Sequence, residues 1–131
     1  MVRTLLIAAA GALGTLTRYG IGLWAGRTLG AAFPYGTLIV NVVGCFLIAL
    51  IAELALSTAW ISPTLRLTLT TGFMGGLTTY SSFNLETTNL LRERGLGEGL
   101  ANVGITLACC FVAGLLGVAL ARQLVAPIAA R

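Results

Sequence analysis

Four apolar stretches divide the chain, and polar or turn-forming residues separate them. The stretches cover residues 4–26, 36–56, 65–91 and 97–121. Each is close to or above the roughly 20 residues that an α-helix needs to cross a ~30 Å hydrocarbon core. The pattern therefore predicts an all-α integral membrane protein, with four transmembrane helices forming one domain over residues 1–131.

The third stretch contains the most unusual local sequence, GFMGGLTTYSSFN at residues 72–84. Three glycines and five hydroxyl side chains fall within these thirteen positions. Glycine costs about 1 kcal/mol relative to alanine in a helix interior, so we expect this helix to be broken in mid-membrane. Broken backbone at that depth is tolerated where it is buried in protein or lines a cavity. Its free N–H groups suit anions, and its free carbonyl groups suit small cations.

Polar and aromatic side chains on the second and third stretches are candidates for an ion site. Asn41 offers two N–H donors, and Thr37 lies one turn earlier on the same face. Ser81 adds a hydroxyl, while Tyr80 and Phe83 can present the positive edges of their rings. Two interpretations of Asn41 stay open, a donor aimed at an anion and an interhelical hydrogen bond worth about 0.6–2 kcal/mol.

The first and last stretches also place polar groups at membrane depth. Asn102, Thr106 and Cys110 are spaced four residues apart and form one stripe on the last helix. The alternative for this stripe is helix packing by small and polar residues. Arg18 lies about two-thirds of the way along the first helix, where it would attract an anion at a vestibule, anchor to carbonyl groups or extend to the interface.

Composition supports the membrane class and excludes several functions. The chain is 57% hydrophobic and 9% charged, with a mean hydropathy of +0.96. It has no histidine, and its three cysteines lie in apolar segments, where we expect them to pack as small residues. Without a nucleophile–base pair or a metal cluster we expect no enzyme, and scattered arginines predict no nucleic-acid binding. Glu53 and Glu86, near the ends of their stretches, are expected to be solvated or salt-bridged.

The arginines outside Arg18 give almost no orientation signal. Four fall on the side of the two termini, Arg3, Arg66, Arg122 and Arg131, and three on the other side, Arg27, Arg92 and Arg94. The positive-inside rule therefore fixes no direction. Either the chain inserts both ways and pairs as an antiparallel dimer, or one orientation is set by the insertion machinery.

The motifs GTLIVNVVGCF at 36–46 and GFMGGLTTYSSFNLET at 72–87, together with Arg18, closely resemble the Fluc/CrcB family of bacterial fluoride channels. The resemblance covers essentially the whole chain. It implies a dual-topology antiparallel homodimer in the bacterial inner (plasma) membrane, embedded in the lipid bilayer. It also implies two pores for passive fluoride efflux, and hence fluoride resistance. A structural Na⁺ at the dimer centre would be held by the backbone carbonyl groups of Gly75 and Thr78.

The resemblance also implies roles for individual side chains. Asn41 matches the pore asparagine, Thr37 the hydroxyl of the second helix, and Tyr80 and Phe83 the two pore phenylalanines. The polar track of the last helix matches Asn102, Thr106 and Cys110. The chain departs from the family at Tyr80, usually Phe, and along this track, where the family usually has a Tyr and two Ser. A thiol is a much weaker donor than a hydroxyl, which places the Cys110 end of the track in doubt.

Two other functions compete with a fluoride channel. A cation/proton antiporter of the small multidrug resistance type is also small and antiparallel, but needs a mid-membrane carboxylate. A non-transporting membrane subunit would carry no ion flux, and would leave Asn41 and the broken third helix unexplained.

Overall fold

A computed structural model describes residues 1–129, with side chains up to residue 126, and this part of the chain is helical without strands. The elements are α1 (Val2–Thr28), α2 (Tyr35–Ser57), α3 (Pro63–Leu67), η1 (Thr68–Met74), α4 (Gly75–Leu77), α5 (Tyr80–Glu93) and α6 (Leu96–Ala129). The predicted all-α class is confirmed. Arg131, which entered the count of arginines, lies outside the described residues.

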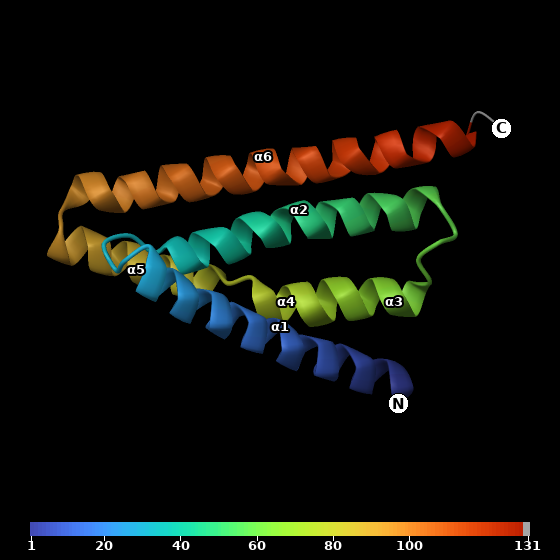
Figure 1. Cartoon of the computed structure of the whole chain (residues 1–131), viewed down its shortest axis with the longest axis horizontal. Coiled ribbons are helices and arrows are strands. Elements are labelled where there is room, and N and C mark those ends of the chain that lie inside the picture. Colours follow the sequence, from blue (N-terminus) through green and yellow to red (C-terminus); the bar gives the residue numbers. More distant parts are fainter. Residues whose placement is uncertain (130–131) are drawn as a thin grey trace.

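Three of these helices are long and apolar enough to cross a membrane, over Val2–Thr28, Tyr35–Ser57 and Leu96–Ala126. They run along the long axis of the molecule. The N-terminus, the loop from α2 to α3 and the far end of α6 lie at one end (Figure 1). The N-terminus, the far end of α6 and the loop near residue 60 are therefore at the same end of the molecule, as the sequence predicted for these parts of the chain. Within this bundle, α2 and α6 run in the same direction and pack along each other.

The third stretch is broken, as predicted, but the break follows the glycines. Helical backbone continues from Pro63 through Leu77, with a π-helical segment over Thr68–Met74. Thr78 and Thr79 are then extended, with φ/ψ of −84°/157° and −155°/117°. The second half restarts as α5, where the Thr79 hydroxyl oxygen accepts the Ser82 N–H at 3.1 Å and caps the helix.

The glycines of this segment serve close packing. A Cβ on Gly76 would collide with the backbone carbonyl of Gly11 and approach the Thr15 nitrogen to 3.0 Å. Gly76 therefore lets the α1 backbone lie directly against the third stretch, because small residues allow helices in a membrane to approach closely. The predicted role of these glycines as helix breakers is wrong, since Gly72, Gly75 and Gly76 are all helical.

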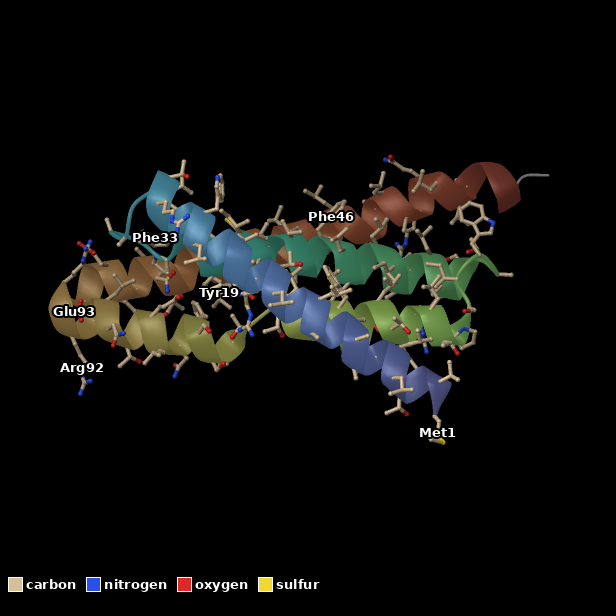
Figure 2. All side chains as sticks on the ribbon, turned by 60° about the horizontal axis from the view of Figure 1, so that its bottom comes forward. Met1, Tyr19, Phe33, Phe46, Arg92 and Glu93 are labelled. Atoms are coloured by element: carbon tan, nitrogen blue, oxygen red, sulfur yellow. The ribbon has the colours of Figure 1, made fainter. Side chains whose placement is uncertain are left out.

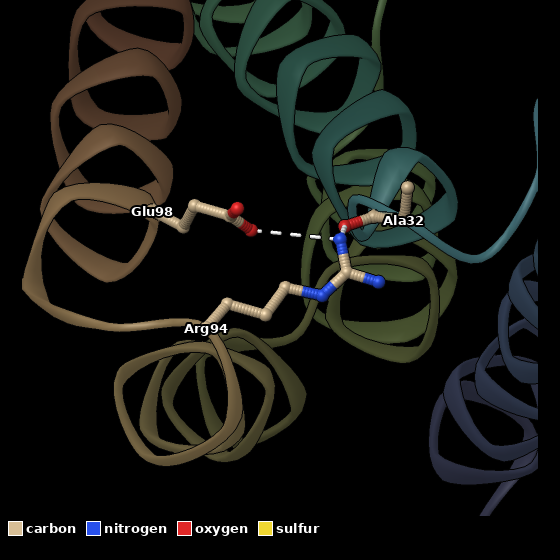
Figure 3. A network of polar contacts seen from close by, with 3 residues as sticks. All are labelled: Ala32, Arg94 and Glu98. Atoms are coloured by element: carbon tan, nitrogen blue, oxygen red, sulfur yellow. Dashed lines mark hydrogen bonds and ion pairs between the residues drawn. The ribbon is translucent and has the colours of Figure 1, made fainter.

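Arg94, which follows α5, joins the α1–α2 loop to the turn between α5 and α6 (Figure 3). Its Nη1 donates to the Ala32 carbonyl in the α1–α2 loop at 2.8 Å and lies 3.5 Å from Glu98 Oε2. Gly95 then turns the chain into α6 with φ of 102°, a conformation that favours glycine. These contacts of Arg94 hold the α1–α2 loop next to the start of α6. The loop leads into α2, the helix that carries Thr37 and Asn41.

Candidate ion pathway at the helix break

Asn41 forms a paired contact with the peptide at the break. The Thr79 N–H donates to Asn41 Oδ1 at 2.8 Å, and Asn41 Nδ2 donates to the Thr79 carbonyl at 3.1 Å. An amide group has two N–H donors, so one remains available. Both interpretations of Asn41 are compatible with this geometry, because the side chain makes an interhelical hydrogen bond and retains a donor.

Thr37 lies one turn before Asn41 and contacts an acidic side chain. Its hydroxyl donates to Glu86 Oε1 at 2.8 Å, while Glu86 Oε2 is buried and has no hydrogen-bond partner among the described residues. The prediction that Glu86 is solvated or salt-bridged is wrong for this reason, since α5 turns the carboxylate inward toward α2. The same prediction is confirmed for Glu53, whose Oε1 accepts from Arg122 Nε at 2.9 Å.

Arg18 lines a cavity of about 290 Å³ beside the break. Its walls include Thr37 from α2 and Thr79 and Ser82 from the start of α5. Arg18 is half-buried, and within the described part of the chain it forms no ion pair. Thr15 and Tyr19 of α1 also line it, so the guanidinium charge, five hydroxyl-bearing residues and the N-terminal end of α5 share one cavity, and each of these features favours an anion.

A second cavity of about 320 Å³ adjoins the first at Gly22, Gly36 and Thr37. The α1–α2 loop and α5 enclose it, with Glu86 and Arg94 among its lining residues. Figure 2 shows Phe33 of that loop on the same side of the molecule as Glu93, and Tyr19 of α1 nearer the centre. Thr37 borders both cavities, and its hydroxyl donates to Glu86, which lines the second one.

The two aromatic candidates form one pair with unequal exposure. The Tyr80 and Phe83 rings are tilted by 52° with centroids 5.7 Å apart. Phe83 is 7% exposed, whereas Tyr80 is 78% exposed, and Ser81 beside it is also exposed. Phe83 is thus packed within the chain, and Tyr80 stands on an exposed face of it.

The polar stripe of α6 forms a connected chain of hydrogen bonds. Thr106 donates to Asn102 Oδ1 at 3.4 Å, and Asn102 Nδ2 donates to the Thr87 hydroxyl at 2.8 Å. Thr87 in turn donates to the Phe83 carbonyl at 2.7 Å. Asn102 and Thr106 are 1% and 5% exposed. The long Thr106 bond is the weakest of the three, so its hydroxyl is the donor most readily redirected.

Cys110 continues the stripe but does not join this hydrogen-bond chain. It is half-buried, and all three cysteines, Cys45, Cys109 and Cys110, have free thiols. At the break, no backbone N–H of the described residues donates to the carbonyl groups of Gly75 and Thr78. Gly75 is exposed and Thr78 is half-buried. Free carbonyl oxygens on an accessible face suit Na⁺, a hard cation that prefers oxygen ligands.

Comparison with known proteins identifies the family. The CrcB-like protein family, described as camphor resistance (CrcB), matches residues 5–118. The chain belongs to the CrcB-like family. The resemblance inferred from the two motifs is thereby confirmed, and the chain is a multi-pass membrane protein. The match includes α1, α2, the broken third stretch and most of α6.

Three relatives of this CrcB-like chain carry the name fluoride-specific ion channel FluC. The protein of Sorangium cellulosum is 54% identical over 126 residues, which cover 96% of this chain and 99% of the relative. That of Geotalea uraniireducens is 48% identical, covering 95% and 100%, and that of Rhizobium etli 47% identical, covering 95% and 100%. Their name is that of an ion channel, in agreement with the prediction that this chain is not an enzyme.

Four side chains of this site were not among the candidates from the sequence, namely Thr79, Ser82, Glu86 and Thr87. Thr87 lies four residues after Phe83, a spacing that allows a threonine hydroxyl to bond the preceding turn. For Glu86, the position near the end of its stretch predicts a place at the membrane interface. Its contact with Thr37 joins residues 49 positions apart, so local spacing gave no signal for it.

Proposed function

We propose that the chain forms a fluoride-selective channel that allows passive efflux of F⁻ from the bacterial cytoplasm across the inner membrane. The observation that carries this proposal is the helix break, because it opens α5 onto the Arg18 cavity. The near-full-length relatives named as fluoride channels support the same function.

Fluoride is small and strongly hydrated, so a selective path must replace its water with hydrogen-bond donors while still releasing the ion. Arg18, Thr37 and Ser82 surround the entry cavity. Asn41 adds its remaining N–H beyond them, and Phe83 and Tyr80 add ring edges. Thr37 can serve the ion when its hydroxyl turns away from Glu86, a rotation about one bond.

The track on α6 would take the ion onward past Asn102, Thr106 and Cys110. Thr106 is suited to this task, because its 3.4 Å bond to Asn102 gives up little when the hydroxyl turns to the ion. Asn102 also retains one N–H beyond the one held by Thr87. The path therefore combines a hydroxyl that can turn easily toward the fluoride ion with an amide N–H that stays fixed. This combination allows the ion to bind and still be released.

The proposed assembly is an antiparallel homodimer with four transmembrane segments per chain, dual topology and two pores. The near-balanced arginines support insertion in both directions. Tyr80, Ser81 and Gly75 form part of an exposed face on the broken third stretch, which a second copy would cover. A structural Na⁺ at this interface would be held by the carbonyl groups of Gly75 and Thr78, and its charge would neutralise the free carbonyl ends of the broken helices.

Efflux needs no energy source of its own. Hydrogen fluoride is a weak acid that enters the cell as the neutral molecule and ionises in a near-neutral cytoplasm. The negative interior of the cell then drives the anion outward through the channel.

The test is fluoride release from liposomes that contain the purified protein, followed with a fluoride electrode. Valinomycin with K⁺ relieves charge build-up, and a parallel run measures chloride. Rapid fluoride release with little chloride release supports the proposal. Absence of fluoride release from a folded dimer in which the protein is correctly inserted contradicts it.

The antiporter alternative is favoured by one observation, the inward-facing Glu86 carboxylate. A proton-coupled exchanger would depend on that carboxylate, so Glu86→Gln would abolish its transport. A fluoride channel needs only the acceptor that holds Thr37, and glutamine keeps one. The same liposomes, given a pH gradient and a cationic substrate, separate the two functions.

A further inference from the structure

The two cavities beside the helix break meet where α1 and α2 cross. Gly22, Gly36 and Thr37 line both cavities. A Cβ on Gly36 would lie only 2.9 Å from the Gly22 Cα, so the backbones of the two helices are in direct contact there. The Thr37 hydroxyl is bonded to Glu86 at 2.8 Å. On its α1 side, the junction of the two cavities is therefore bordered by the backbone of Gly22.

Gly22 lies in the middle of the α1 face that lines the cavities. The residues of this helix that line them are spaced three or four positions apart, a spacing that places side chains on one face of a helix. They are Thr15, Arg18, Tyr19, Gly22, Ala25 and Gly26. The members before Gly22 line the Arg18 cavity and those after it line the second cavity, while Gly22 lines both. A side chain at position 22 would therefore point toward the junction.

The space next to Gly22 is open. A Cβ on this residue would have no atom of the described residues within 4 Å, apart from atoms of its own helical turn. Alanine is also favoured over glycine in a helix interior, so neither packing nor helix propensity calls for glycine at this position. Gly36 and Gly76 differ, because a Cβ on either would approach a neighbouring backbone closely. The absence of a side chain at Gly22 therefore leaves room in the junction.

We propose that Gly22 keeps the connection between the two cavities open and determines the width of the fluoride path at this point. This inference rests on the proposed fluoride channel. A methyl group at position 22 would occupy part of the junction that Thr37 also borders. It offers no hydrogen-bond donor, so it would displace water that solvates the ion without replacing the contacts of that water. Fluoride transfer between the Arg18 cavity and the second cavity should then slow.

Gly22→Ala tests this role, because it should change stability and transport in opposite directions. Without a steric clash, alanine should raise the thermal midpoint in detergent by about 2–5 °C through its higher helix propensity. Fluoride release from liposomes with the same amount of inserted protein should fall at least about tenfold. Gly22→Val carries a larger side chain and should release fluoride more slowly still.

Three other glycines provide matched controls. Gly20 lies on the same helix, has no atom within 4 Å of its Cβ position and lines neither cavity. Gly20→Ala should therefore raise the midpoint and release fluoride at the wild-type rate. Gly26 lines only the second cavity, so Gly26→Ala should slow release less than Gly22→Ala. Gly36→Ala should lower the midpoint, because its Cβ would press on the Gly22 backbone.

The direction in which position 22 points can be tested without fluoride. Cys45, Cys109 and Cys110 are first replaced by alanine, and a single cysteine is then introduced as Gly22→Cys or Gly20→Cys. A water-soluble, sulfonate-bearing methanethiosulfonate transfers its thioalkyl group to the cysteine thiolate, which forms a disulfide and releases methanesulfinate. Because it acts on a thiolate in contact with water, it should label Gly22→Cys in liposomes at least about tenfold faster than Gly20→Cys. Labelling of Gly22→Cys no faster than that of Gly20→Cys would overturn the open junction.

The outcomes separate this inference from the proposed channel. If the wild type releases no fluoride, the proposed channel fails, and the labelling still decides whether position 22 faces the cavities. If the wild type conducts and Gly22→Ala releases fluoride at the same rate, Gly22 does not set the width of the path. A fall in both the midpoint and the release of Gly22→Ala would show a packing role and would also contradict the inference. A raised midpoint with slow release, alongside normal release by Gly20→Ala, supports it.

Discussion

Asn41 and Thr79 are joined through two opposite hydrogen bonds, in which the Asn41 amide replaces the helical partners that the Thr79 peptide lost at the break. The N–H of Thr79 donates to Oδ1 at 2.8 Å, and Nδ2 donates to its carbonyl at 3.1 Å. Thr79 is 8% exposed. A buried peptide without a partner costs about 1–3 kcal/mol per group, so this side chain stabilises the broken backbone as well as offering a donor to an ion.

The substitution Asn41→Asp keeps the shape of the side chain but removes its N–H donors. Aspartate keeps the acceptor for the Thr79 N–H but loses the donor to its carbonyl, and it adds a negative charge near the Arg18 cavity. A lost donor to a charged group is worth about 1.5–3 kcal/mol. Fluoride release should therefore fall about ten- to a hundredfold in liposomes. Gln123→Glu, the same amide-to-carboxylate change at an exposed position of α6 outside both cavities, should release fluoride at the wild-type rate.

Phe83→Ile tests the contribution of a ring edge. Isoleucine keeps an apolar side chain at this buried position but has no positive edge to offer an anion. We expect fluoride release to fall at least about tenfold while the dimer persists in size-exclusion chromatography. Tyr80→Phe keeps the ring and should retain release, and normal release by Phe83→Ile would remove Phe83 from the pore.

Thr87→Val tests the hydrogen-bond chain between α5 and α6. Valine has a similar shape but leaves the Asn102 N–H without its 2.8 Å partner in a site where Asn102 is 1% exposed. The protein should lose about 1–3 kcal/mol of stability, seen as a lower thermal midpoint in detergent. Thr87→Ser keeps the hydroxyl and should lose much less. Equal midpoints for valine and serine would show that the chain of bonds contributes little.

Gly44→Ala tests the close approach of α2 to the break. The new Cβ would collide with the Cγ2 methyl group of Thr78. Overpacking of this kind costs about 1–3 kcal/mol, so the thermal midpoint should fall and fluoride release should decrease. Thr78→Ser removes the methyl group and should rescue Gly44→Ala in the double variant. Gly104→Ala, with nothing within 4 Å of its Cβ, is the control and should be neutral or stabilising.

Replacing Glu53 and replacing Glu86 should have different effects on fluoride release, because the two carboxylates have different surroundings. Glu53→Gln removes a partly exposed ion pair with Arg122, which is worth at most about 1 kcal/mol, and should leave fluoride release unchanged. Glu86→Gln keeps an acceptor for Thr37 and should retain much of the release. Glu86→Ala leaves the Thr37 hydroxyl without that acceptor and should alter release more than Glu86→Gln. Loss of transport in Glu86→Gln would favour the proton-coupled antiporter.

The sequence by itself determined the features that depend on neighbours along the chain. Apolar stretches of sufficient length predicted the helices. The actual bounds, such as Val2–Thr28 for residues 4–26, differ by one or two residues at every end but one, since α6 continues to Ala129 and the prediction ended at residue 121. Spacing of four residues placed Asn102 and Thr106 on one face, where they are hydrogen-bonded. The concentration of glycine and hydroxyl side chains predicted a broken helix, because helix propensity is a local property.

The tertiary structure alone decided which distant groups meet. It assigned Asn41 to the Thr79 peptide, turned Glu86 toward Thr37, and bonded Asn102 to Thr87. It also moved the break beyond the glycines, because packing against α1 holds Gly76 in a helix that its propensity disfavours. Such pairings depend on the register between helices far apart in sequence, and this register is set by how their surfaces pack together.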